Sequence, residues 1–365
     1  MKEHFRHNAG FAGPNTRLAI QEDRADFTPC FFYEVPRFFR DGTIPVDVAV
    51  VHLSRPDKQG RCSFGVSCDY TKPAAEAASV VIAEINDRMP YVNGDNFIHI
   101  SKLDRIVETS FPIYETAKPT IGEVEKAIGR HCASLIKDGA TLQLGIGGIP
   151  EAVLTCLKDK KNLGIHTEMF SDGVMELVES GVINGSCKTL HPGKLVATFL
   201  MGSQRLYDFV DRNPMVELYP VDYVNDPRII AQNRNMVSVN SCIEIDLFGQ
   251  VCSEMIGKRQ FSGTGGQVDY VRGASMSEGG ISIMAMPSTA AGGKISRIVP
   301  YLAEGAAVTT TRNDVDYVVT EYGIAPLKGR SLRKRAEALI AIAHPDFRES
   351  LTEEFFKRFP CALKK

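Results

Sequence analysis

Glu168 is the side chain whose position in the sequence most suggests chemistry. It follows residues 164–167, which have the apolar pattern of a short strand, and the turn signal Ser171-Asp172-Gly173 comes soon after it. Ligands of open α/β sheets bind at the carboxyl ends of strands, where this carboxylate would lie. On spacing alone, however, a surface residue or a helix cap is the favoured interpretation of a glutamate after a strand.

A glycine loop precedes Glu168 in the chain. Gly145, Gly147 and Gly148 follow the strand-like residues 141–144 and open a helical pattern. The free N–H groups of such a loop can hold an anion or let a ligand pass close to the backbone. Pro150 stands where a dinucleotide fingerprint would have its third glycine, although Glu168 lies near the distance expected for a ribose partner. A plain packing turn and a dinucleotide site therefore remain alternatives.

Two further segments are rich in small residues. Residues 261–270 contain a second glycine turn with Gly263, Gly265, Gly266 and Gln267. Adjacent amides in such a turn can stabilise an oxyanion, although a simple connection between elements explains it equally well. Residues 286–296 permit close approach and supply Lys294 as a cation.

Three other polar residues are candidates with plain structural explanations. Glu244 alternates with apolar neighbours like a strand residue and is interpreted as structural support. Glu321 ends a strand pattern and could orient a cleft or serve a structural hydrogen bond. His166 lies two residues before Glu168, so both side chains share one face of a strand; a packing histidine is the favoured interpretation.

Short apolar strands alternating with helical patterns indicate the parallel α/β architecture that would position these residues. The predicted helix 121–137 starts from a capping box of Thr120 and Glu123, and Pro150 suits the first turn of another. The domain boundary is predicted between residues 118 and 119. Strands are predicted at residues 48–53, 80–85, 141–144, 164–167, 195–198, 236–239, 281–284, 307–310 and 317–320.

Composition excludes several function classes. The chain has 365 residues, 44% of them hydrophobic, and a net charge of −2, which gives no basic field for nucleic acid. No signal peptide and no membrane-spanning run is recognised, so a cytoplasmic location is expected. The cysteine count is nine, without C-x-x-C spacing, which argues against a disulfide framework or a metal site and for reduced, mostly buried thiols.

The glycine loop, Glu168 and the second glycine turn belong to an ordered series of motifs. In sequence order these are residues 145–150, 166–168, 224–227, 263–267 and 320–323. The series closely resembles the acetyl-CoA hydrolase/transferase family, in particular its branch of 4-hydroxybutyrate and butyryl-CoA:acetate CoA-transferases. The resemblance covers essentially the whole chain. It implies two open, mostly parallel α/β domains of the CoA-transferase type, residues 1–118 and 119–365, the first incomplete at its N-terminus.

The resemblance also implies roles for individual residues. Glu168 would be the nucleophile, Gly265 and Gly266 would direct amides at the thioester carbonyl oxygen, and Asn225 would lie at the carboxylate site. The predicted CoA-binding residues are Gly145, Gly147, Gly148, Gly263, Gln267 and Lys294. Coenzyme A would be part of a substrate thioester rather than a tightly bound cofactor. The partners would be acyl-CoA and short-chain carboxylates, and a homo-oligomer is expected.

A carboxylate nucleophile suits this reaction on chemical grounds. Attack of a carboxylate on a thioester releases no proton, so the enzyme needs an ionised glutamate and a stabilised oxyanion but no general base. Water must be kept out, because it would turn the same intermediate into that of a hydrolase. A hydrolase therefore remains open. So does an inactive paralogue, because residues 1–13 look loop-like and the first domain looks short, although a misassigned start codon would also explain this.

Overall fold

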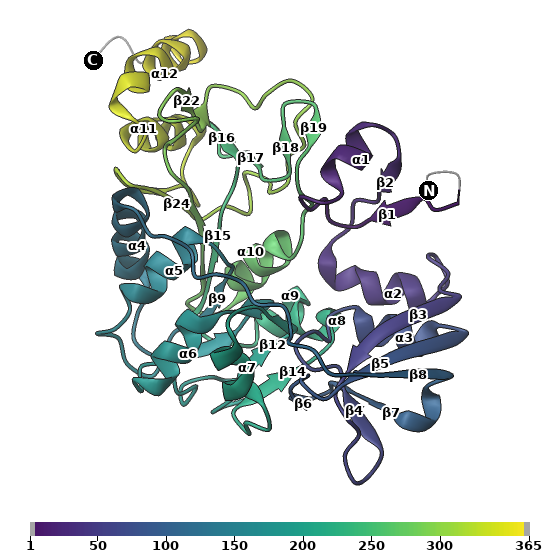
Figure 1. Cartoon of the computed structure of the whole chain (residues 1–365). Helices are drawn as coiled ribbons and strands as arrows, with labels where there is room; N and C mark the ends of the chain where they lie inside the picture. Colours follow the sequence, from purple (N-terminus) through teal and green to yellow (C-terminus); the bar gives the residue numbers. More distant parts are fainter. Residues whose placement is uncertain (1–3, 361–365) are drawn as a thin grey trace.

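A nine-stranded sheet forms the centre of the structure, a computed structural model that describes residues 4–360 (Figure 1). Its strand order is β25-β24-β20-β15-β9-β10-β12-β14-β6. All neighbours are parallel except β24 and β25. The central strands are buried along nearly their whole length, as expected for a parallel sheet with helices on both faces. The predicted α/β class with mostly parallel sheets is confirmed.

The order of the strands reverses next to β9, which defines the switch point of the sheet. From β9 the chain proceeds outward through β10, β12 and β14, then returns to β15 on the other side of β9 and proceeds through β20 and β24. Ligand crevices of open sheets lie at the carboxyl ends of the strands around such a point. The strands are β9 (Thr141–Leu144), β10 (Gly164–His166), β12 (Leu195–Ala197), β14 (Val216–Leu218), β15 (Met236–Asn240), β20 (Ile281–Ala285), β24 (Tyr317–Thr320), β25 (Gly323–Pro326) and β6 (Asn93–Gly94).

Helices cover both faces of this sheet. The helix α4 (Glu123–Leu135) packs on α5 (Gly148–Thr155) and contacts β20 and β24, whereas α10 (Gln267–Met276) packs on β15 and β20. Figure 1 shows α4 and α5 on one side of β15 and α10 on the other. Buried aliphatic side chains of the strands and of α4, α5 and α6 (Asp172–Glu179) form the largest core cluster.

The N-terminal part of the chain has its own small sheet. The strands β3 (Val48–Leu53), β5 (Val80–Asn86) and β8 (Arg105–Thr109) are parallel, with β5 in the middle. The two-residue strand β6 leaves this region and pairs with β14 of the large sheet. Gly94 permits this close approach, because it has φ +106° and a Cβ there would lie 2.1 Å from the Leu218 carbonyl oxygen. The boundary between residues 118 and 119 stays a prediction.

The remaining elements are short except for the two C-terminal helices. They are β1 (His7–Ala9), α1 (Arg17–Gln21), β2 (Ala25–Phe27), η1 (Phe32–Glu34), α2 (Val35–Arg40), β4 (Arg61–Ser63), α3 (Thr71–Ala77), β7 (Phe97–His99), η2 (Ile100–Lys102), β11 (Met169–Phe170), β13 (Phe199–Leu200), α7 (Gln204–Val210), α8 (Val221–Val224), α9 (Pro227–Ile230), β16 (Glu244–Asp246), β17 (Val251–Cys252), β18 (Met255–Ile256), β19 (Arg259–Gln260), β21 (Thr289–Ala290), β22 (Ile295–Ser296), β23 (Ile298–Val299), α11 (Leu332–Ala341) and α12 (Pro345–Arg358).

Most predicted strands are confirmed, and three local predictions are wrong. Residues 307–310 form no strand; only the buried Thr310 bridges to Val251, whereas Val308 is exposed. The helix α4 is capped by Gly122 rather than by the predicted Thr120, so it begins two residues later than predicted. The Gly122 N–H donates to Glu125 Oε2 at 3.0 Å. Within the segment expected to be loop-like, residues 7–9 form β1, which pairs with β2.

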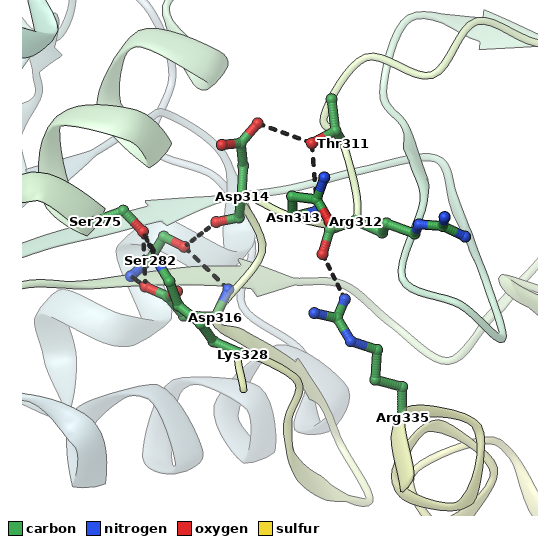
Figure 2. A network of polar contacts seen from close by, with 9 residues as sticks. All are labelled: Ser275, Ser282, Thr311, Arg312, Asn313, Asp314, Asp316, Lys328 and Arg335. Atoms are coloured by element: carbon green, nitrogen blue, oxygen red, sulfur yellow. Dashed lines mark hydrogen bonds and ion pairs between the residues drawn. The ribbon is translucent and has the colours of Figure 1, made fainter. Parts of the chain in front are cut away.

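A polar network braces the sheet at the edge where β20 and β24 begin (Figure 2). The Asp316 carboxylate accepts from the Ser282 N–H at 2.9 Å and pairs with Lys328 at 2.9 Å. Ser275, near the end of α10, donates to the same carboxylate. The first turn of α10 lies at the opposite edge of the sheet, so the network fixes the far end of that helix. Arg335 of α11 donates to the Arg312 carbonyl nearby.

The described helices include none that is long and apolar enough to cross a membrane. The described cysteines are free, and five of the eight are buried. Cys187 is exposed, which departs from the expected burial, and Cys361 lies outside the described residues.

Candidate active site

Glu168 lies in the short link between β10 and β11, at the carboxyl edge of the large sheet next to its switch point. Its carbonyl oxygen accepts from the Thr198 N–H at 2.9 Å, which fixes its backbone to the chain after β12. Thr167 donates its hydroxyl to the Leu144 carbonyl at 3.1 Å, so the link also lies beside the start of the glycine loop. The carboxylate is thus held on the edge where open sheets bind their ligands.

Asn225 donates its side-chain amide to this carboxylate. The distance from Asn225 Nδ2 to Glu168 Oε2 is 2.8 Å. Asn225 is fully buried at the junction of two single-turn helices: it ends α8, and the next residue, Asp226, caps α9 by accepting from the Arg228 N–H at 2.8 Å. Pro227 then occupies the first helical position. The motif at residues 224–227 therefore builds a rigid corner that presents one amide to Glu168.

Gly266 closes the other side of the carboxylate. A Cβ at this position would lie 1.9 Å from Glu168 Oε2 and 2.3 Å from Asn225 Nδ2, so only glycine fits. Gly266 precedes the first turn of α10, and its N–H also stabilises the ionised carboxylate. Its neighbour Gly265 has φ +54°, a left-handed conformation that brings the turn against Glu168.

Burial dominates the electrostatics of Glu168. It raises the pKa of the carboxyl to about 7, the Asn225 amide opposes the shift, the charge of Asp69 adds to it, and the Gly266 N–H opposes it. The side chain is partly exposed, so a ligand can reach it. Near neutral pH the group thus exists in both protonation states, and the poor solvation of its ionised form favours nucleophilic reactivity.

Two acids near Glu168 were not singled out in the sequence. Asp269, in the first turn of α10, is buried, accepts from the Tyr33 N–H at 3.3 Å and has a pKa well above its usual range because of burial and the charge of Glu168. Asp269 lies only three residues after Gly266 in the sequence, and this spacing could have indicated that it lies near the site. Asp69 comes from the loop before α3; burial raises its pKa, opposed by the Thr71 hydroxyl. No sequence pattern near Asp69 points to Glu168.

Comparisons with known proteins identify the family of this chain. A model of the acetyl-CoA hydrolase/transferase N-terminal domain matches residues 1–113, and a model of the C-terminal domain matches residues 202–355. A 4-hydroxybutyrate coenzyme A transferase of Clostridium kluyveri is 67% identical over 359 residues, which are 98% of this chain and 84% of that protein. The chain belongs to the acetyl-CoA hydrolase/transferase family.

Other members of the acetyl-CoA hydrolase/transferase family are similar along most of their length. A succinyl-CoA:cyclohexane-1-carboxylate CoA transferase of Geobacter metallireducens is 50% identical, covering 96% of this chain and 80% of that protein. Among solved structures, a 4-hydroxybutyrate CoA-transferase of Porphyromonas gingivalis has a TM-score of 0.84 at 56% identity, covering 95% of this chain and 84% of that one. RipA of Yersinia pestis has a TM-score of 0.87 at 42% identity, covering 94% and 78%. These structures also confirm the fold class.

The first glycine loop of this family member lies beside a cavity of about 220 Å³. Gly147 has φ +112°, and both Gly145 and Gly147 have open space at the Cβ position, so a ligand could approach their backbone. Gly148 instead packs on Glu125, where a Cβ would lie 3.3 Å from the side chain. The cavity is lined by Thr116, Ala117, Lys118, Pro119, Gly145, Ile146, Gly147, Glu151, Ser171, Asp172 and Met201.

The other predicted CoA-binding residues have different surroundings. Gly263 packs on the N-terminal segment, where a Cβ would lie only 2.9 Å from the Gly10 carbonyl oxygen. The Gln267 amide donates to Ser253 and Thr310, at 2.8 and 2.9 Å, which braces the turn. Lys294 lies in the loop between β21 and β22 and is exposed. Sequence alone did not indicate that residues 10–11 cover the second glycine turn.

The rival polar residues have structural partners. The Glu244 carboxylate accepts from the Ala303 N–H at 2.8 Å, and that of Glu321 accepts from the Ser288 N–H at 2.8 Å. His166 is fully buried, with Nε2 2.8 Å from the Val224 carbonyl oxygen. Within residues 4–360, no cluster of three or more His, Cys, Asp or Glu side chains could hold a metal ion.

Proposed function

We propose that this protein transfers coenzyme A between a short-chain acyl-CoA and a carboxylate, with Glu168 as the covalent carrier. The observation that carries the proposal is the setting of the Glu168 carboxylate between the Asn225 amide and Gly266 at the switch point of the sheet. The names of the relatives point to the same class of reaction, since one is a 4-hydroxybutyrate coenzyme A transferase and another a butyryl-CoA:acetate CoA-transferase.

The reaction begins with ionised Glu168. Its carboxylate attacks the acyl carbonyl, forms a mixed anhydride and expels the CoA thiolate. The thiolate then attacks the glutamyl carbonyl, which releases the first acid and leaves glutamyl-CoA. A second carboxylate attacks this thioester to give a new anhydride and thiolate, and the thiolate takes the new acyl group. Glu168 returns as a carboxylate, so no tightly bound cofactor is needed.

Neighbouring groups supply orientation and charge stabilisation. We assign to the amides of Gly265 and Gly266 the stabilisation of the oxyanion that forms when the thioester carbonyl is attacked. The Asn225 amide favours the ionised carboxylate and orients it. The cavity beside Gly145 and Gly147 lies near the carboxyl edge of the large sheet, and we assign part of the substrate to it. A cytoplasmic, homo-oligomeric enzyme with dissolved substrates fits this proposal.

Trapping of the intermediate tests the proposal. Purified protein is incubated with butyryl-CoA or acetyl-CoA without an acceptor acid, reduced with borohydride and mapped by mass spectrometry. We expect a CoA-dependent change at Glu168 that is absent in Glu168→Ala and in a sample without acyl-CoA. A folded protein that shows no change at Glu168 would contradict the proposal. Competition between acetate and water then separates transferase from hydrolase, which share the intermediate.

A further inference from the structure

The backbone carbonyl of Val224 receives two side-chain hydrogen bonds. His166 Nε2 lies 2.8 Å from this oxygen, and Tyr270 Oη lies 3.1 Å from it. Val224 directly precedes Asn225, His166 lies two residues before Glu168, and Tyr270 donates its N–H to the Gly266 carbonyl at 3.0 Å. One oxygen atom therefore ties together the chain segments that carry Glu168, Asn225 and Gly266.

The position of Val224 explains why its carbonyl takes two donors. It is the last residue of α8, and the last carbonyl groups of a helix have no partner within the helix. Val224 and His166 are fully buried and Tyr270 is 1% exposed, so solvent is not available to the carbonyl. A carbonyl oxygen has two lone pairs, and the two side chains occupy both.

We propose that His166 and Tyr270 are positioning residues, which act through the Val224 carbonyl to hold the Asn225 amide on the Glu168 carboxylate. This inference rests on the proposed role of Glu168 as nucleophile. Asn225 is the next residue after the clamped carbonyl, so movement of Val224 would move the corner that presents the amide. The clamp also joins β10 to α10, the two elements on either side of the carboxylate.

The chemistry of the two donors suits a fixed clamp. His166 must carry its proton on Nε2 to donate to the carbonyl, and Nδ1 is buried with no hydrogen-bond partner among the described residues. Burial and the charge of Lys188 lower the pKa of His166 to about 3, so the ring stays neutral near pH 7. Tyr270 has a pKa well above its usual range because of burial and keeps its hydroxyl proton. Neither group gains or loses a proton during the reaction.

Loosening the clamp has a defined effect on Glu168. The Asn225 amide favours the ionised carboxylate, so a weaker contact raises the pKa of Glu168. The acid side of the pH profile of kcat/KM for acyl-CoA then moves to higher pH. A purely structural role would reduce the amount of folded protein without moving this profile.

Tyr270→Phe is the smallest change that tests the clamp, because it removes one hydroxyl and keeps the ring. We expect a loss of about 3- to 10-fold in kcat, little change in KM, and an acid limb displaced to higher pH. Tyr207→Phe is the matched control: Tyr207 is also buried and donates to a backbone carbonyl, that of Tyr114, at 2.7 Å. It should leave kcat and the pH profile unchanged.

A double-mutant cycle decides whether the effect passes through Asn225. The rate of glutamyl-CoA formation is measured in a single turnover for Tyr270→Phe, Asn225→Ala and the double variant. We expect Tyr270→Phe to cause no further loss when Asn225 is already Ala. An equal loss in both backgrounds, or an unmoved acid limb, would overturn the positioning role. Absence of the Glu168 adduct in the unchanged protein would instead contradict the proposed function.

Discussion

Glu168 stands between influences of opposite sign. Burial and the charge of Asp69 raise the pKa of its carboxyl, whereas the Asn225 amide and the Gly266 N–H lower it, and the result is about 7. As the proposed nucleophile, Glu168 must be ionised to attack a thioester. A higher pKa makes the carboxylate a better nucleophile but leaves less of it ionised at neutral pH. In the proposed mechanism, the neighbours of Glu168 therefore set the pH range in which the enzyme works.

Opposite shifts in the pH profile are expected from two neighbours of Glu168. In the unchanged protein, kcat/KM for acyl-CoA should fall as the pH drops below about 7. Asp69→Asn removes a negative charge and should move this acid limb to lower pH, whereas Asn225→Ala removes a donor and should move it to higher pH. Initial rates between pH 5 and 9 measure both. Shifts in the same direction would contradict this account.

Gly266→Ala should abolish most activity while the protein still folds. The added Cβ would lie 1.9 Å from Glu168 Oε2, which displaces the carboxylate. Gly266 has φ −90° and ψ 6°, a conformation open to alanine, so the backbone itself is not strained. We expect kcat to fall by about 100-fold or more, as for loss of an oxyanion donor. Gly13→Ala is the control, since a Cβ there has open space and Gly13 lies outside the left-handed region.

At the scale of elements, α10 connects the active site to the opposite edge of the sheet. Gly266 precedes its first turn, and Ser275 near its end joins the Asp316 network of Figure 2. Gly273 lets this helix pack closely on α9, because a Cβ there would lie 2.5 Å from Ile230. The last turn of the helix is thus held by two contacts, at Gly273 and Ser275, which helps to fix the turn at its start that contacts Glu168.

Asp316→Ala should destabilise the protein far more than it impairs the active site. Its removal leaves the buried Ser282 N–H without this acceptor and takes away the ion-pair partner of Lys328. We expect the free energy of unfolding to fall by ~2–4 kcal/mol. Urea unfolding measures this, with Asp314→Ala as a control from the same network whose carboxylate is more exposed. Equal losses for both variants would show that burial of Asp316 does not matter.

Elements with a strong local pattern were predictable from the sequence, and those set by distant contacts were not. Three predicted strands, at residues 48–53, 141–144 and 317–320, match the structure at both ends because apolar runs of strand length determine them. In residues 307–310 Val308 is exposed and only Thr310 is buried, and their single bridge depends on Val251, which is distant in sequence.

The candidate site divides in the same way. Glu168, Asn225 and Gly266 were indicated by ordered motifs, and the structure brings these three together. Asp69 and the covering segment at residues 10–11 come from the other end of the chain. Their approach to the site depends on the packing of the N-terminal part against the large sheet, which no local pattern records.

At the scale of the whole molecule, the active site opposes stability. A carboxyl that is buried and has a raised pKa prefers to be protonated, so its ionisation costs folding free energy. The unfolded chain binds fewer protons than the folded one between the ordinary pKa of 4.5 and the folded value of about 7. As far as Glu168 is concerned, the free energy of unfolding is therefore highest below pH 4.5, where Glu168 is protonated in both states. It decreases as the pH rises from 4.5 through 7.

Glu168→Gln should accordingly stabilise the protein in a pH-dependent manner. The amide has nearly the same shape as the carboxyl group and carries no charge, so the variant avoids the cost of ionisation. We expect a gain in the free energy of unfolding of ~1–3 kcal/mol at pH 8 that shrinks toward zero near pH 5. Urea unfolding at both pH values measures the gain. Glu244→Gln is the control, because its carboxylate accepts from the Ala303 N–H away from the site. A gain that is equal at the two pH values would mean that ionisation of Glu168 is not what destabilises the folded enzyme.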